Sequence, residues 1–135
     1  MERKQVILDT NFLLVPEQNR IDIFSEIEGI MDAPYDLYII ETTLRELEKL
    51  QTRGKGSDKV AARIGHQLME RYGVKMLPAQ KEHGRLVDDQ IVGRAKADPK
   101  STIVCTNDKE LKKRVLDEGA SIIEVMQKKY LRRRG

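Results

Sequence analysis

The chain of 135 residues lacks tryptophan, has one cysteine and four prolines, and is only 4% aromatic. Cys105 cannot form an internal disulfide, and because it stands in an apolar run we expect a small buried hydrophobe rather than a catalytic thiol. The longest apolar runs fall far short of the roughly 18 residues that a membrane span needs, and the first residues lack the apolar stretch of a signal peptide. We therefore expect a cytoplasmic protein without membrane contact.

Charge is abundant and unevenly distributed. Charged residues make up 35% of the sequence and the formal net charge is +3. Residues 126–135 hold five of the 25 Lys and Arg residues and no acid, which leaves 20 basic against 22 acidic residues elsewhere. We divide the chain into one domain over residues 1–125 and a basic C-terminal tail over residues 126–135.

The basic tail is a candidate nucleic-acid contact. A run of Lys and Arg predicts binding to phosphates, and an aromatic side chain within it can stack on a base. A solvated terminus is the alternative interpretation. The candidate RNA-binding residues are Lys128, Lys129, Tyr130, Arg132, Arg133 and Arg134.

Apolar runs alternate with amphipathic segments along the chain. Strands are predicted over residues 4–8, 36–40, 74–77, 102–106 and 121–125. Helices are predicted at residues 21–31, from Thr42 or Thr43, from Ser57 or Asp58 to Gly73, at 87–97, and from Asn107 or Asp108 to Gly119. Alternation with helices of ten or more residues predicts an α/β fold with a mostly parallel, five-stranded sheet covered on both faces.

Acidic residues recur after the predicted strands, at Asp9, Glu46, Asp88, Asp89 and Asp108. Ligands of open parallel sheets bind outside the carboxyl ends of the strands, so we expect these acids to form one cluster. Crowded carboxylates raise one another's pKa unless a cation lies between them, and Mg²⁺ or Mn²⁺ is the ion that oxygen ligands favour. Hydrogen bonds that fix these carboxylates are expected from Thr10, Asn11, Thr106 and Asn107.

Each acid also has a purely structural interpretation. Asp9 and Asp108 would serve as helix caps, and Glu46 as an exposed helix charge. The adjacent acids exceed what one cap requires, although the helix dipole would favour both. Helical period places Asp88 nearer the apolar stripe of its helix and Asp89 away from it, without deciding between them.

Four segments, in this order, resemble the acidic motifs of PIN-domain nucleases. They are residues 9–13 (DTNFL), 44–48 (LRELE), 88–91 (DDQI) and 106–111 (TNDKEL). The resemblance covers essentially the whole chain. With its doubled acid, the run at 111–114 and the basic tail, the chain is most similar to archaeal relatives of the PIN endoribonuclease of the ribosomal small-subunit processome. The resemblance implies a three-layer α/β/α fold with a five-stranded, mostly parallel sheet.

The resemblance also implies an activity. It assigns Asp9, Glu46, Asp89 and Asp108 as catalytic, metal-ligating acids, with Asp88 as an extra acid and further ligand. It implies a Mg²⁺- or Mn²⁺-dependent endoribonuclease that hydrolyses RNA phosphodiester bonds, leaves 5′-phosphate and 3′-hydroxyl ends, and takes part in ribosomal RNA processing. RNA is the implied partner, and a homodimer is implied by resemblance only.

The sequence fits other functions less well. A phosphatase of the aspartyl-phosphate type needs a second acid where Asn11 stands, and a receiver domain needs its acid pair after the first strand. A VapC-type toxin shares the nuclease chemistry and differs in its biology. A noncatalytic RNA-binding PIN scaffold would be signalled by the loss of an acid, and all the acids of the motifs are present.

Overall fold

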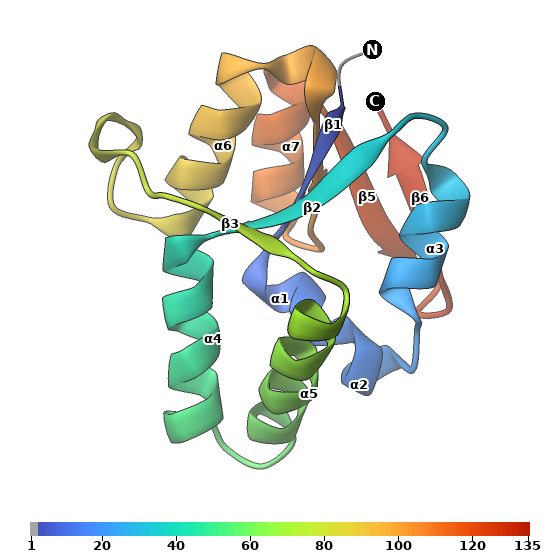
Figure 1. Ribbon diagram of the computed structural model, residues 1–135, viewed down its shortest axis with the longest axis vertical. Coiled ribbons are helices and arrows are strands. Elements are labelled where there is room, and N and C mark those ends of the chain that lie inside the picture. The colour runs from blue at the N-terminus through green and yellow to red at the C-terminus, as the bar shows by residue number, and fades with distance from the viewer. Residues whose placement is uncertain (1–2) are drawn as a thin grey trace.

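The computed structural model describes residues 3–135 and shows one six-stranded sheet between two sets of helices (Figure 1). The sheet order is β3-β2-β1-β4-β5-β6, and all neighbours are parallel except β5 and β6. The strands are β1 (Lys4–Leu8), β2 (Tyr35–Ile40), β3 (Lys75–Leu77), β4 (Thr102–Cys105), β5 (Ser121–Met126) and β6 (Tyr130–Arg134).

Seven α-helices connect the strands. They are α1 (Thr10–Leu13), α2 (Val15–Asn19), α3 (Ile23–Ile30), α4 (Glu41–Arg53), α5 (Ser57–Arg71), α6 (Val87–Ala97) and α7 (Lys109–Asp117), with short 3₁₀ turns at Lys81–His83 and Pro99–Ser101. None of the helices within residues 3–135 is long and apolar enough to cross a membrane.

The core has two halves because successive strand residues point to opposite faces of the sheet. Val6 and Leu8 face the half built with α1 to α5, whereas Ile7 faces the half built with α6 and α7. Figure 1 shows α6 and α7 as one pair and α4 and α5 as another on separate sides of the sheet. The three-layer α/β/α architecture predicted from the sequence is confirmed.

The strand order reverses direction beside β1. The chain proceeds from β1 to β2 and β3 on one side, and then returns to place β4 against the other side of β1. The crevice at such a reversal, outside the carboxyl ends of the strands, is where open α/β sheets bind ligands. Asp9 directly follows β1 at this point.

Helix α4 begins earlier than predicted. It starts at Glu41, immediately after β2, with Ile40 at the capping position and no side-chain cap. Thr42 and Thr43, the predicted caps, have buried hydroxyl groups without a hydrogen-bond partner among the described residues. The strand therefore leads straight into the helix, which fixes Glu46 one turn and a half inside it.

The prediction of five strands is wrong by one, because residues of the expected tail form β6. Lys129 N–H donates to Met126 O at 3.0 Å and closes a hairpin in which Gln127 and Lys128 have φ of 52° and 57°. Two left-handed residues in succession favour Asn-Gly, so Gln-Lys gave no signal of a turn. Leu131 is 6% exposed, so the segment from 130 onward is packed into the domain.

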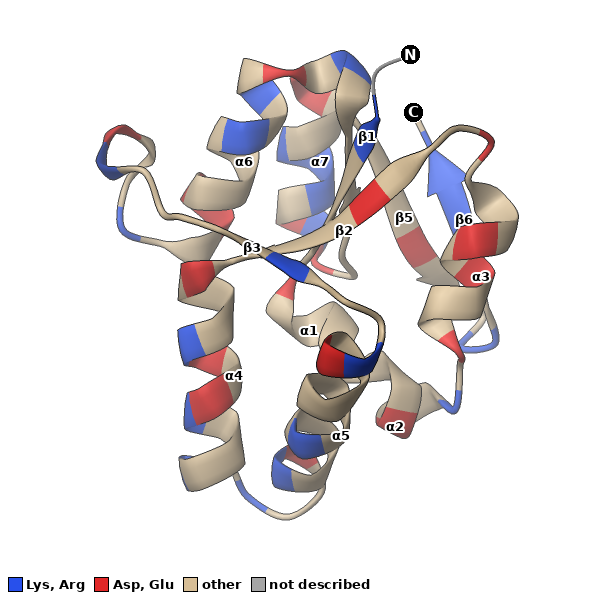
Figure 2. Ribbon diagram, in the orientation of Figure 1, with Lys and Arg blue, Asp and Glu red and all other residues tan. Residues whose placement is uncertain are grey.

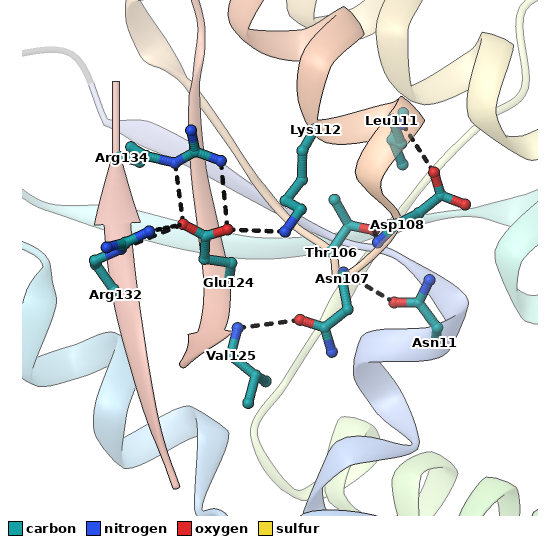
Figure 3. A network of polar contacts seen from close by, with 10 residues as sticks. All are labelled: Asn11, Thr106, Asn107, Asp108, Leu111, Lys112, Glu124, Val125, Arg132 and Arg134. Carbon is teal, nitrogen blue, oxygen red and sulfur yellow. Dashed lines mark hydrogen bonds and ion pairs between the residues drawn. The ribbon is translucent and has the colours of Figure 1, made fainter. Parts of the chain in front are cut away.

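Buried Glu124 anchors the added strand to the rest of the fold (Figure 3). Its carboxylate accepts from Lys112 Nζ at 2.8 Å, from Arg132 Nη2 at 2.8 Å and from Arg134 Nε at 3.0 Å. Burial alone would raise the pKa of Glu124, but the hydrogen bonds from Lys112, Arg132 and Arg134 outweigh it and lower the pKa to about 2. Two of the predicted RNA-binding arginines are thus committed to an internal ion-pair network.

Glu124→Gln should lower the free energy of unfolding at pH 7 by roughly 2–3 kcal/mol, because three cations lose their anion. The folded-state pKa lies below the ordinary value of 4.5, so this stabilisation is full above pH 4.5 and is lost as the pH falls towards 2. Chemical denaturation of both proteins from pH 7 to pH 2.5 measures the difference.

The control is Glu110→Gln, since Glu110 is exposed and the substitution should change stability little at any pH. A Glu124→Gln deficit of the same size at pH 7 and pH 2.5 would contradict the ionic origin of the effect.

Candidate active site

Asp9 is the buried centre of the candidate site, only 5% exposed. Its Oδ1 accepts from the Thr10 N–H at 2.8 Å, and its Oδ2 accepts from Thr106 Oγ1 at 2.7 Å and Asn11 Nδ2 at 3.1 Å. Burial, followed by the nearby charges of Asp88 and Glu46, outweighs these bonds and raises the pKa of Asp9 to about 6. Neutral donors therefore hold the side chain in place, while burial first and like charge second disfavour its ionised form.

The neighbouring polar residues hold the other acids. Thr10 Oγ1 donates to Glu46 Oε1 at 2.6 Å and joins α1 to α4. Thr106 Oγ1 accepts from the Asp108 N–H at 3.1 Å while it donates to Asp9, so one hydroxyl links two acids. These contacts place Thr10, Asn11 and Thr106 where the sequence predicted them.

Asn107 is placed differently from its neighbours (Figure 3). Its N–H donates to Asn11 Oδ1 at 3.3 Å, and its Oδ1 accepts from the Val125 N–H at 3.0 Å. It therefore supports the loop after β4 and reaches the acids only through Asn11.

Asp108 is both a helix cap and a member of the acidic pocket. As the N-cap of α7 it accepts from the Leu111 N–H at 2.9 Å through Oδ1. It is exposed and lines the same pocket as Asp9. One carboxylate oxygen is used by the cap, which leaves Oδ2 for other ligands.

The adjacent acids Asp88 and Asp89 have different contacts. Asp88 lines the pocket, and its pKa is raised by burial and then by the charges of Asp108 and Glu46. Asp89 instead accepts from Arg114 Nη2 at 2.9 Å, in an ion pair between α6 and α7. The acid assigned to the cluster from the sequence, Asp89, is thus not among the described residues that line the pocket, whereas the extra acid, Asp88, is.

One pocket of about 590 Å³ brings four acids together from four places in the chain. Asp9 follows β1, Glu46 lies on α4, Asp88 on α6, and Asp108 caps α7. Within residues 3–135, no three His, Cys, Asp or Glu side chains already converge as a metal site. The acids therefore surround a shared space instead of forming a closed coordination shell.

The pocket has further lining residues outside the set predicted from the sequence. One side is formed by the face of α4 beyond Glu46 and by the residues that adjoin it. The additional lining residues are Leu14, Lys49, Leu50, Arg53 and Gly54. Their spacing could have predicted this, because Leu50 and Arg53 follow Glu46 by four and seven residues and such residues share one helix face.

The predicted RNA-binding residues of the C-terminal segment lie elsewhere. None of them is among the described residues that line the acidic pocket. Arg132 and Arg134 bind Glu124, and Arg133 Nη1 lies 3.9 Å from Asp32 Oδ1. Lys128 and Lys129 lie in the exposed hairpin turn, and Tyr130 is 41% exposed.

Comparisons with known proteins agree with this architecture. The family model described as PIN like domain matches residues 6–128. Ribonuclease VapC4 of Methanocaldococcus jannaschii is 30% identical over 128 residues, which cover 93% of each chain. The rRNA-processing protein fcf1 of Schizosaccharomyces pombe is 38% identical over 113 residues, which cover 82% of this chain and 52% of that protein.

Among solved structures, the PIN domain endonuclease Utp24 superposes with a TM-score of 0.74 and 32% identity, over 96% of this chain and 90% of that one. The family match spans all four acids of the pocket, Asp9, Glu46, Asp88 and Asp108. The sequence resemblance is confirmed, and this chain belongs to the family of PIN-like domains.

Proposed function

We propose that this chain is an endoribonuclease that hydrolyses RNA phosphodiester bonds with Mg²⁺ or Mn²⁺. The observation that carries the proposal is the meeting of Asp9, Glu46, Asp88 and Asp108 at one pocket. The relatives named as ribonucleases and as an endonuclease support the same reaction class. RNA is the proposed substrate, and the cytoplasm is the proposed compartment.

The donor set fits a hard divalent cation. Ionised carboxylates only accept hydrogen bonds, so the four acids offer nothing but negative oxygen atoms to a phosphodiester. Oxygen ligands of this kind are those that Mg²⁺ and Mn²⁺ prefer. Asp9, Glu46, Asp88 and Asp108 would hold the ions, which when bound supply an activated water and neutralise charge on the phosphate.

The polar neighbours of the acids orient them for this task. Three donors fix the carboxylate of Asp9, and the Thr10 hydroxyl fixes Glu46 across the pocket. Because these donors are neutral, they position Asp9 without supplying a positive charge that would compete with a cation. The pKa of Asp9 is raised because its carboxylate is buried without a neighbouring positive charge.

The lining of the pocket favours water as the nucleophile. Among the described residues that line it there is no Ser, Cys or His, and the hydroxyl of Thr10 is bonded to Glu46. Hydrolysis here requires no protein nucleophile, because the divalent ions, when bound, would activate a water for attack on the phosphorus. Direct hydrolysis is the reaction that the pocket supports.

Two biological roles fit this chemistry. We propose ribosomal RNA processing first, because fcf1 is named as an rRNA-processing protein and Utp24 matches most of the chain. The VapC-type toxin is the alternative, favoured by the 93% mutual coverage with Ribonuclease VapC4. Co-purification of a small inhibitory partner that blocks cleavage would favour the toxin. A homodimer remains a prediction, and the mass of the protein in solution tests it.

The activity is tested with structured and single-stranded RNAs in Mn²⁺, Mg²⁺ or chelator, beside an Asp9→Asn variant. Internal cleavage with either ion, and none with chelator, is the expected result. Binding of RNA without cleavage under any condition would instead support a noncatalytic scaffold.

Asp9→Asn should abolish cleavage and leave the thermal midpoint in metal-free buffer unchanged or raised. A folded-state pKa of about 6, above the ordinary value of 3.8, means that ionised Asp9 lowers stability above pH 6 by an amount on the order of 3 kcal/mol. Asn removes this cost, but it also removes one hydrogen-bond acceptor, and that loss reduces the gain in stability by about 1–2 kcal/mol.

Thermal unfolding at pH 5 and pH 7.5 with chelator measures this effect, and the gain of the variant over wild type should shrink at pH 5. A large destabilisation at pH 7.5 would show that Asp9 serves chiefly as a helix cap.

Asp88→Asn should lose more activity at saturating RNA than Asp89→Asn, because Asp88 lines the pocket and Asp89 is bonded to Arg114. Asp89→Asn should lower stability by about 0.5–1 kcal/mol through the broken ion pair. Initial rates and denaturation curves of both variants separate the two roles. A greater loss of rate in Asp89→Asn would restore the assignment made from the sequence.

A further inference from the structure

Residues 78–86, the segment between β3 and α6, are bound to α6 along their length (Figure 1). Arg94 Nη2 on the helix donates to Pro78 O at 2.6 Å. The ring of His83 lies directly on Gly93, where a Cβ atom would clash with it. The segment therefore has a fixed place against the helix, although its only regular structure is one 3₁₀ turn.

Gln90 makes the central contact between α6 and this segment. The side chain is buried, 1% exposed, and its Oε1 accepts from the Gln80 N–H at 2.8 Å. Its Nε2 donates to Gln80 O at 2.8 Å and to Gly84 O. The amide uses its oxygen and its nitrogen at once. A carboxylate at this position could not donate to the two carbonyl groups, and an apolar side chain could bind none of the three backbone groups.

The same segment is also bound to α4. The Ala79 N–H donates to Oε1 of Glu41, the first residue of α4, at 3.0 Å. Ala79 is adjacent to Gln80, so two successive residues of the segment join the two helices. Figure 2 shows acidic residues at the start of α4 and at the start of α6. We call the contacts from Glu41 to Ala79 and from Gln80 to Gln90 the α4–α6 bridge.

The two helices joined by the bridge carry two acids of the pocket. Glu46 follows Glu41 by five residues on α4, and Asp88 precedes Gln90 by two on α6. At 1.5 Å per residue, these separations are only about 7.5 Å and 3 Å along the helix axes. The relative position of Glu46 and Asp88 therefore depends on contacts made close to both of them.

Asp88 depends on its helix more than the other acids of the pocket do. Hydrogen bonds from neighbouring groups hold the carboxylates of Asp9, Glu46 and Asp108. Among residues 3–135, no group donates a hydrogen bond to the carboxylate of Asp88. Mg²⁺ needs oxygen ligands at about 2.0–2.1 Å in near-octahedral geometry, so a small displacement of one acid weakens its binding. The place of α6 is thus what determines whether Asp88 can serve as a ligand.

We infer that Gln90 is a positioning residue of the acidic pocket, which through the α4–α6 bridge places Asp88 relative to Glu46 for binding a divalent ion. This inference rests on the proposed function and assigns a residue outside the pocket to its metal site. A residue that only stabilised the fold would leave the affinity of the folded protein for the ion unchanged.

The test is the affinity for Mn²⁺ without RNA, measured by electron paramagnetic resonance of the free ion. Gln90→Met keeps the length of the side chain and removes its hydrogen bonds. Loss of a group that orients metal ligands costs about 10–100-fold in affinity or activity, and because Gln90 acts through a helix we expect about tenfold weaker binding. In RNA cleavage the Mn²⁺ concentration for half-maximal rate should rise by the same factor, and KM for RNA should stay unchanged.

The matched control is Gln5→Met. Gln5 Nε2 donates to Thr102 Oγ1 at 2.8 Å, at the ends of β1 and β4 that lie away from Asp9. Both variants are measured at a temperature at which circular dichroism shows them folded, and Gln5→Met should bind Mn²⁺ like the wild type. Equal weakening in both variants, or unchanged affinity in Gln90→Met, would overturn the inference.

Glu41→Ala tests the other end of the bridge at a partly exposed position. Its control is Glu48→Ala, which removes the same charge from an exposed position of the same helix. Glu41→Ala should weaken Mn²⁺ binding and Glu48→Ala should not. Because Gln90→Met and Glu41→Ala break one bridge, the double variant should bind about as weakly as the weaker single variant. A loss equal to the product of the two single losses would show independent effects and would contradict the bridge.

RNA cleavage by the wild type in Mn²⁺ separates this inference from the proposed function. Cleavage by the wild type, with wild-type Mn²⁺ affinity in Gln90→Met and Glu41→Ala, would remove the bridge and keep the nuclease. Weaker Mn²⁺ binding in both variants, with no cleavage by the wild type, would keep the bridge and remove the nuclease. Absence of Mn²⁺ binding by the wild type would overturn both.

Discussion

The pairing of β1 with β4 is the interaction on which the site depends. The two strands are parallel, with Leu8 opposite Cys105, and the Asp9 N–H donates to Cys105 O at 3.0 Å beyond the last pair. This register brings Asp9 and Thr106 into contact although 97 residues separate them. A slip of one residue would turn the fully buried Ile7 to the wrong face, so the core that fixes the register also fixes the site.

Asp9 and Glu124, the two most buried carboxylates among residues 3–135, have opposite electrostatic surroundings. Glu124 is surrounded by Lys112 and two arginines, and its pKa is lowered to about 2. Asp9 is equally buried but receives only neutral donors, and its pKa is raised to about 6. The three cations around Glu124 compensate its negative charge and stabilise the fold. The surroundings of Asp9 leave a negative charge that only a ligand can compensate, which is typical of a functional site.

Local periodicity was sufficient to predict most of the fold. The strands at 4–8 and 102–105 and the helix at 87–97 have strong apolar patterns, and the acids after them converge because parallel strands end at one edge. The missed features depend on distant partners. The strand β6 is stabilised by Glu124 across a turn without Gly or Asn, and Asp89 is bound by Arg114 from another helix.

The last strand also determines how the sheet can meet other molecules. β6 lies at an edge, and an open edge offers unpaired backbone groups to a strand of another chain. Here the Leu131 N–H already donates to Glu26 Oε1 at 2.9 Å, and arginines occupy three of the five positions of the strand. A β6 strand from a second copy would find the Leu131 N–H already bonded, and its own arginines would lie next to these arginines. Association by sheet extension is therefore disfavoured at this edge.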